Sequence, residues 1–208
     1  MSRSPKDRAD SERAALGVER RHRGRDATRH AVGALTTSEY AILGLLSFGE
    51  KSGYELFRFA ERSVGFIWAP AKSQIYKVLP RLAATGLARG RVVAQSKRPD
   101  KQLYRLTAAG RRALGRWLTS VEVDGDPDIY LLKIFFGRQA PNAALIAQVA
   151  AYRDLCARTL AQYEELDRGL TRDEKNALPL EILALGLLRT RTNVTWAEAL
   201  LIELRRDT

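Results

Sequence analysis

The sequence predicts a mainly α-helical protein with one small β-hairpin near the middle of the chain. Three features of the sequence support this fold class. Ser or Thr followed three residues later by Glu marks helix starts, at Thr36 and at Ser52. Apolar residues recur at helical spacing over most of the chain after residue 36. Two short segments rich in Val, Leu and Tyr flank the basic loop 95–101 and predict the hairpin.

The first predicted helix begins at Thr36, and the second runs over GYELFRFAER after a turn that contains Gly49. We expect Tyr54 and Phe57 of the second helix to lie in the core. A third helix has an apolar stripe formed by Ile75, Val78, Leu79 and Leu82. Gly86 supplies a stop for it, and the hairpin follows. This order of elements is that of a winged helix-turn-helix: three helices, a strand, a basic tip and a second strand.

The other side of the third helix is polar and cationic. No acidic residue lies between Lys72 and Gly86. Gln can bond an adenine edge, Arg and Lys can address guanine, and Ser or Tyr hydroxyls reach phosphates or bases. The candidate DNA-binding residues on this helix are Lys72, Ser73, Gln74, Tyr76, Lys77 and Arg81. A charged face that only contacts water is the simpler alternative.

Three more basic residues, Lys97, Arg98 and Lys101, lie at the hairpin tip. They are candidates for contact with phosphates or for entry into a minor groove. The alternative is a charged tip that serves only to keep the hairpin soluble.

The positive charge of the chain is concentrated in the same region. The chain has 208 residues, of which 45% are hydrophobic, and a formal net charge of +11. Residues 36–118 hold fifteen basic and five acidic side chains, whereas residues 119–208 hold eleven and fourteen. Because neutralising phosphates releases condensed counterions, this local excess of +10 indicates a polyanionic partner. A basic surface that is merely solvated is the alternative.

We divide the chain into three parts. Residues 1–35 are basic and poor in large apolar side chains, which predicts a disordered tail. Residues 36–120 form the winged helix-turn-helix, whose last helix is capped by Thr107. The acidic, turn-prone stretch VDGDPD marks the boundary, with Asp126 as a helix cap. Residues 121–208 form a C-terminal α-helical dimerisation domain.

Two long helices are predicted in this C-terminal domain. The helix that begins near Pro141 has residues at alternating steps of four and three, namely Leu145, Val149, Tyr152, Cys156, Thr159, Tyr163, Leu166 and Leu170. We interpret this seam as a packing face shared within a dimer. The last helical region, residues 179–205, is too apolar for one face of a solvated helix and must be covered.

The runs SEYAILGLLSFGEKSGYELFRFAE and SQIYKVLPRLAATGLARGRVVAQSKRPDKQLYRLTAAGRRAL resemble the winged helix-turn-helix of the PadR family of bacterial transcriptional regulators. The segment IYLLKIFFG also resembles the start of the C-terminal helical domain in one branch of this family. The resemblance implies a major-groove role for the 72–85 helix, carried onto Ser73, Gln74, Tyr76, Lys77 and Arg81. Similar sequences more often have a long or charged residue where this chain has Pro80, and we expect a bend there and not a break.

Proteins of this family often respond to phenolic acids or other small aromatic molecules. Drug-sized ligands favour apolar aromatic pockets, so Phe66, Trp68 and Trp117 are candidate effector-binding residues, and Trp196 is a further aromatic residue to consider. Ordinary core packing is the alternative for each of them.

Catalysis is not expected, and neither is a metal site or a cofactor. His22 and His30 both lie in the tail, Cys156 lies on the seam, and a Gly-rich phosphate loop is absent from the sequence. A single cysteine excludes an internal disulfide and fits a reducing cytosol. The sequence shows neither a signal peptide nor an apolar run of the roughly 18 residues that a membrane span requires. We therefore expect a cytoplasmic protein without a membrane partner.

These observations predict a sequence-specific transcriptional regulator. By resemblance it is a PadR-like repressor that binds an inverted repeat in double-stranded DNA as a homodimer and is relieved by a small-molecule effector. The main alternative is an architectural protein that coats DNA without sequence choice. An enzyme acting on phosphodiesters or nucleotides is a third, more distant possibility.

Overall fold

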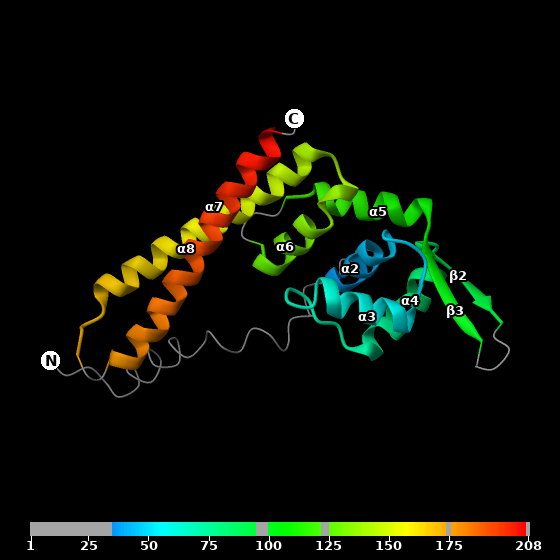
Figure 1. The fold of residues 1–208 in the computed structure, drawn as a ribbon, viewed down its shortest axis with the longest axis horizontal. Coiled ribbons are helices and arrows are strands. Elements are labelled where there is room, and N and C mark those ends of the chain that lie inside the picture. The colour runs from blue at the N-terminus through cyan, green and yellow to red at the C-terminus, as the bar shows by residue number, and fades with distance from the viewer. Residues whose placement is uncertain (1–34, 95–99, 122–124, 174–175, 207–208) are drawn as a thin grey trace. The chain divides into compact units, whose positions relative to one another are not determined.

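The computed structural model describes residues 35–94, 100–121, 125–173 and 176–206. Residues 1–34 of the predicted tail lie outside this part, as do Lys97 and Arg98. The elements in chain order (Figure 1) are α2 (Thr37–Leu46), β1 (Lys51–Ser52), α3 (Gly53–Ser63), α4 (Lys72–Ala84), β2 (Ala88–Val93), β3 (Lys101–Leu106), α5 (Ala108–Thr119), α6 (Pro127–Phe135), the 3-10 turn η2 (Gly137–Gln139), α7 (Asn142–Gly169) and α8 (Ala177–Arg206). The predicted fold class, mainly helical with a small β-wing, is confirmed.

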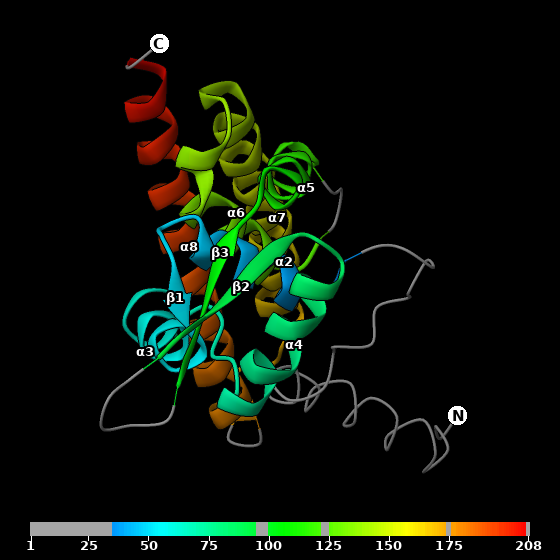
Figure 2. The same ribbon diagram turned by 90° about the vertical axis from the view of Figure 1, so that its right-hand side faces the viewer.

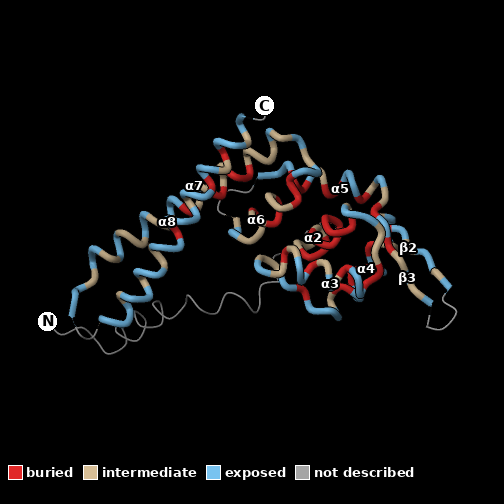
Figure 3. The backbone as a smooth tube through the Cα atoms, in the orientation of Figure 1, coloured by how far each residue is buried: buried red, intermediate tan, exposed pale blue. Residues whose placement is uncertain are grey.

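The core of the N-terminal half lies around α2, which is buried along most of its length. Figure 3 shows the same concentration of buried positions in α2 and on one side of α3 and α4. The predicted apolar stripe of α4 faces this core with Ile75, Val78, Leu79 and Leu82. α3 begins with the predicted capping box, in which the Ser52 hydroxyl accepts from the Glu55 amide and the Glu55 carboxylate accepts from the Ser52 amide.

The predicted hairpin belongs to a three-stranded antiparallel sheet with the order β1-β3-β2. β2 and β3 pair along six residues each and extend beyond the helices (Figures 1 and 2). β1 pairs Lys51 with Tyr104 and Ser52 with Leu103. The sequence did not predict β1, because a two-residue strand has no periodicity of its own and its partner lies far along the chain.

α4 continues through Pro80 to Ala84, so the expectation that the proline would not break the helix is confirmed. Pro80 is exposed, which allows water to reach the carbonyl of Tyr76 that has lost its helical donor. Gly86 follows with a φ of +72°, and the Leu87 amide then donates to the Leu82 carbonyl. This glycine stop turns the chain directly into β2.

α5 returns from the wing to the helical core. Its predicted cap is confirmed: Thr107 Oγ1 accepts from the Gly110 amide at 3.0 Å. The same hydroxyl donates to the Gly86 carbonyl at 2.7 Å, so the end of the hairpin is tied to the turn that begins it.

α6, α7 and α8 form the C-terminal half. Asp126 caps α6 by accepting from the Asp128 amide, with Pro127 in the first turn. α7 and α8 run side by side (Figure 1). Their shared core contains Tyr130, Val149, Tyr152, Cys156, Ala197 and Leu201.

The seam predicted on α7 has a different partner from the one we expected. Three seam residues are buried against α6 and α8 of the same chain, namely Val149, Tyr152 and Cys156. They therefore cannot contact a second subunit. Farther along α7 the burial ends, and Leu166 is 56% exposed. The regular spacing identified a packing face correctly, but spacing alone carries no information on which chain covers it.

Within the described residues, each helix is too short or too polar to cross a membrane.

Candidate nucleic-acid interface

α4 presents an exposed cationic face opposite its apolar stripe. Lys72, Ser73, Tyr76 and Lys77 are all exposed, and the side of the helix that bears them carries no acidic residue. The stripe that packs on the core fixes which side of α4 faces outward. These four side chains therefore form a continuous set of donors that could reach phosphates or base edges.

The structure separates Gln74 and Arg81 from this set. Gln74 Nε2 donates to Ser38 Oγ at 2.8 Å, and Arg81 Nε donates to Glu39 Oε1 at 2.8 Å. Ser38 and Glu39 are buried residues of α2, whereas the Arg81 side chain is still 50% exposed. Both contacts join α4 to α2, which gives these two residues a role in fixing the position of the helix.

Tyr54 extends the exposed face from α4 onto α3. We expected Tyr54 in the core, and that expectation is wrong because 55% of its surface is exposed. Lys72 Nζ lies 5.4 Å from the centre of the Tyr54 ring and 5.8 Å from that of Tyr76. The Tyr76 ring also packs on Gly53, where an added Cβ would approach it to 3.2 Å. The first turn of α3 thus meets the first two turns of α4 through two aromatic rings and an ammonium group.

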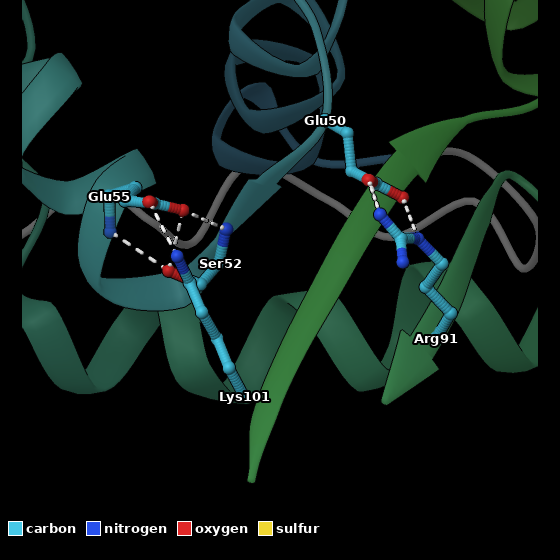
Figure 4. Close-up of polar contacts among 5 residues, drawn as sticks. All are labelled: Glu50, Ser52, Glu55, Arg91 and Lys101. Atoms are coloured by element: carbon cyan, nitrogen blue, oxygen red, sulfur yellow. Dashed lines mark hydrogen bonds and ion pairs between the residues drawn. The ribbon is translucent and has the colours of Figure 1, made fainter. Parts of the chain in front are cut away.

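Two ion pairs join the strands of the wing to Glu50 and Glu55, just before and at the start of α3 (Figure 4). Lys101 Nζ contacts Glu55 Oε1 at 2.6 Å, and Arg91 Nε donates to Glu50 Oε1 at 2.9 Å. Lys101 was predicted at the wing tip, and the structure places it opposite Val93, in the pair of the hairpin nearest the loop. Its ammonium contacts Glu55 beside the capping box of α3, and its contact with DNA stays a prediction. Lys97 and Arg98 lie outside the described residues, so their role stays a prediction.

Sequence reasoning missed a group of arginines on the strands. Arg89, Arg91 and Arg105 are exposed, and Arg89 lies directly opposite Arg105 in the pairing of β2 with β3. The sequence did contain a sign of this group: Arg89 and Arg91 are two residues apart, and side chains two residues apart in a strand lie on the same face of the sheet. These residues give the wing a cationic face of its own, on which Arg91 is paired with Glu50.

The pKa of the Glu55 carboxyl is lowered from its ordinary value of 4.5 to about 2, first by the hydrogen bond from Lys101 and then by that from the Ser52 amide. A carboxyl with a depressed pKa stabilises the fold above its unfolded pKa and loses that contribution as pH falls toward the folded value. Glu55→Gln is therefore expected to lower stability at pH 7, by about 1 kcal/mol because the half-exposed site is screened by solvent. Denaturant unfolding at pH 7 and at pH 2 should show the difference from wild type shrinking at the lower pH.

Glu61→Gln is the matched control for this measurement. Glu61 lies on the same helix and pairs with Arg58 on the exposed surface. Its replacement should change stability by less than about 0.5 kcal/mol at pH 7. An equal loss in both variants would show that the Lys101 contact has no special contribution.

Comparison with known proteins agrees with this geometry. The model of the transcriptional regulator PadR-like family matches residues 42–116, and the model described as virulence activator alpha C-term matches residues 128–205. A probable transcriptional regulator of Mycobacterium tuberculosis is 31% identical over 140 residues, which are 62% of this chain and 74% of that protein. The chain belongs to the PadR-like family of transcriptional regulators.

Other PadR-like proteins match over greater lengths. The negative transcriptional regulator PadR of Bacillus subtilis is 28% identical over 183 residues, covering 81% of this chain and 98% of that protein. The crystal structure of Bacillus subtilis PadR in complex with operator DNA matches at 26% identity, covers 82% of this chain and 99% of that chain, and gives a TM-score of 0.43.

The candidate effector residues of this PadR-like chain do not share one environment. Trp117 is buried, stacked on Tyr40 with ring centres 5.0 Å apart. Phe66 is 84% exposed on the connection between α3 and α4, and Trp68 is half-buried nearby in sequence. An open hollow of about 480 Å³ beside this connection is lined by Phe57, Glu61, Gly65, Ala69, Pro70, Ala71 and Lys72, and by none of the three candidates. Trp196 packs edge-on against Tyr152.

α8 carries a second apolar face that the rest of the described chain leaves exposed. Its buried residues Thr190, Ala197 and Leu201 face the chain's own core. At 100° per residue, a separate stripe lies about a third of a turn away. The members of this exposed stripe are Leu178, Ile182 and Leu185, with Leu188 at its edge. Trp196 lies farther along the same side of α8, beyond the exposed Arg189. Figure 3 shows most of α8 as exposed.

Proposed function

We propose that this chain is a sequence-specific transcriptional repressor that binds duplex DNA as a homodimer. The observation that carries the proposal is the exposed face of α4, where Lys72, Ser73, Tyr76 and Lys77 lie without an acidic neighbour on the helix. Side chains of these types contact phosphates and base edges in a major groove. The similarity to a protein named as a negative regulator favours repression over activation.

The roles of the candidate residues divide in two under this proposal. Lys72, Ser73, Tyr76 and Lys77 contact DNA, and Lys97 and Arg98 bind phosphate from the wing. Gln74 and Arg81 hold α4 on α2, and Lys101 holds the wing on α3, so these three act by positioning the residues that touch DNA.

The partner of the exposed stripe on α8 is, in this proposal, the same stripe of a second copy. Its apolar surface is too extensive for a helix in water, and a two-fold contact would bury both copies at once. The pairing would hold the two α4 helices at a separation matching one turn of DNA, about 34 Å, which requires an inverted repeat.

The decisive test is a footprint of the full chain on the DNA that adjoins its own gene, followed by competition with bulk DNA. A protected inverted repeat, bound about 10³-fold more tightly than bulk DNA at a stated salt concentration, is expected. An architectural coating protein would also bind with steep salt dependence, but it would show almost no preference in the competition. The absence of any protected repeat would contradict the proposal.

Lys77→Ala is expected to weaken operator binding by about tenfold or more with little change in folding stability. Lys77 is exposed at the centre of the proposed DNA-binding face, and a lost contact of this kind costs about 1–3 kcal/mol. Fluorescence anisotropy on the footprinted operator would measure the loss, and thermal unfolding would confirm the fold. Arg168→Ala, which removes an equal charge from an exposed position of α7, should leave the affinity unchanged.

Relief by a small aromatic effector completes the proposal. A phenolic acid that favours a dimer geometry mismatched to the operator would release DNA in proportion to its preference for that geometry. Titrating simple phenolic acids into the complex of protein and operator should release the DNA if this part is correct. If no such compound shifts the operator affinity, the effector part fails while the DNA-binding part stands.

A further inference from the structure

The C-terminal end of α5 is held by side chains from two later helices. Gln148 Nε2, from α7, donates to the Leu118 carbonyl at 3.0 Å and to the Ser120 carbonyl at 2.8 Å. Lys133 Nζ, from α6, donates to the same Ser120 carbonyl at 2.7 Å. The last carbonyls of a helix have no partner within the helix and carry the negative end of its dipole, so an ammonium and an amide are suitable donors.

Both donors are buried, and Lys133 and Gln148 are each only 1% exposed. A buried ammonium is stable only while it is well solvated by protein groups, because removing it from water costs several kcal/mol. The face of the Trp117 indole lies 5.3 Å from Lys133 Nζ and also stabilises the ammonium. Small changes in the angle between α5 and the two later helices would break these contacts together.

α2 links α5 to α4, the proposed DNA-binding helix. Trp117 of α5 stacks on Tyr40 of α2 with an angle of 5° between the rings. The two residues before Tyr40 are Glu39 and Ser38, which bind Arg81 and Gln74 of α4. Side-chain contacts thus join α6 and α7 to α5, α5 to α2, and α2 to α4, and three consecutive residues of α2 link the last two steps.

An apolar contact supports the same junction. Gly44 of α2 lies against the ring of Phe136 at the end of α6, where an added Cβ would approach the ring carbons to 2.7 Å. Phe136 is 1% exposed. Packing this close leaves little freedom for α6 to slide on α2.

We propose that Lys133 and Gln148 are positioning residues for DNA recognition, which fix α5 and with it α4 at one angle to the C-terminal helices and so set the half-site spacing that the dimer accepts. This inference rests on the proposed function, because it assumes that the C-terminal half pairs two DNA-reading halves. This role differs from simple stabilisation of the fold. Lys133 and Gln148 would determine which spacings between half-sites the dimer can bind, and they would not change the affinity for a single half-site.

The test uses Lys133→Met and Gln148→Leu in the full chain. Methionine keeps the length and packing of lysine without its charge. Leucine at position 148 removes both donated hydrogen bonds, but it also removes Oε1, a buried acceptor without a partner among the described residues, and Lys133 still donates to the Ser120 carbonyl. These two effects offset part of the cost, and we expect this variant to fold. Arg138→Met, which removes a charge from the exposed surface of η2 close to Lys133 in sequence, is the matched control.

Affinity is measured on the footprinted operator, on one isolated half-site, and on operators with one or two base pairs inserted between the half-sites. Each inserted pair rotates one half-site by about 34°. Wild type and Arg138→Met should lose about 100-fold or more on the two-pair insertion. Lys133→Met and Gln148→Leu should lose less than about tenfold there, with half-site affinity and dimer mass unchanged.

The outcomes separate this inference from the proposed function. If wild type protects no inverted repeat, the proposed function itself fails. If wild type discriminates between spacings and a folded Gln148→Leu discriminates equally well, the inference is wrong even though the proposed function holds. If Lys133→Met does not fold, Gln148→Leu decides the question alone.

Discussion

Leu185→Glu is expected to convert the protein into a monomer that no longer binds its operator tightly. Leu185 lies in the middle of the exposed stripe of α8, between Ile182 and Leu188, and is itself 51% exposed. In a two-fold contact the substitution places a carboxylate from each subunit in an apolar interface, where an unpaired charge is strongly unfavourable. We expect the dimer dissociation constant to rise by about 10³-fold, the size of effect seen at the centre of an interface.

Sedimentation equilibrium would measure the mass, and anisotropy on the full operator and on one half-site would measure the functional loss. Binding to the half-site should persist, because α4 is unchanged. Ala184→Glu is the control: Ala184 is also exposed on α8 but lies about a third of a turn from the stripe. A Leu185→Glu protein that stays dimeric would show that α8 pairs through another surface or not at all.

Gly110→Ala is expected to destabilise the N-terminal half by roughly 3 kcal/mol. A Cβ at this position would overlap the carbonyl oxygen of Leu87 and approach Leu106 Cδ1 to 2.7 Å. The Leu87 carbonyl cannot simply retreat, since it also accepts from the amide of Thr107, the residue that caps α5. Overpacking a well-packed core usually costs about 1–3 kcal/mol, and a clash with backbone lies at the upper end of that range.

Gly115→Ala on the same helix provides the comparison. An added Cβ at Gly115 would meet no atom within 4 Å. Because glycine in a helix interior costs about 0.5–1 kcal/mol relative to alanine, this variant should be slightly more stable than wild type. Denaturant unfolding of the two variants should give changes of opposite sign, and a loss of stability in both would contradict the packing described here.

The parts of the fold that depend on neighbouring residues could be predicted from the sequence. The Ser52–Glu55 box, the Thr107 cap, the Gly86 stop and the apolar stripe of α4 all depend on groups within a few residues of each other. The location of the exposed cationic helix followed from the same local patterns. Such features are legible because secondary structure places fixed sequence separations on fixed faces.

The features that were missed depend on partners far away in the sequence. Gln74 and Arg81 look like ordinary members of a cationic face, and only the fold brings Ser38 and Glu39 beneath them. Lys101 does lie next to the wing loop, but its contact with Glu55 was not foreseen because it requires β3 to lie next to the start of α3. Tyr54 has the large aromatic side chain of a typical core residue, but in the fold this side chain is exposed. Periodicity shows that one face of a helix differs from the others, but it does not show which residues contact that face.

Pro80 makes the last turn of α4 easier to displace than the turns before it. Since proline has no amide hydrogen, the last turn of α4 is attached to the preceding turn by one backbone bond fewer than usual. The salt bridge from Arg81 to Glu39 acts across this gap as a side-chain tether to α2. Amide protons beyond the proline should therefore exchange with solvent faster than those before it, and weakening the tether should accelerate them selectively. The terminal turn would then behave as a separately adjustable segment, able to tilt toward a DNA backbone while the first turns stay in register.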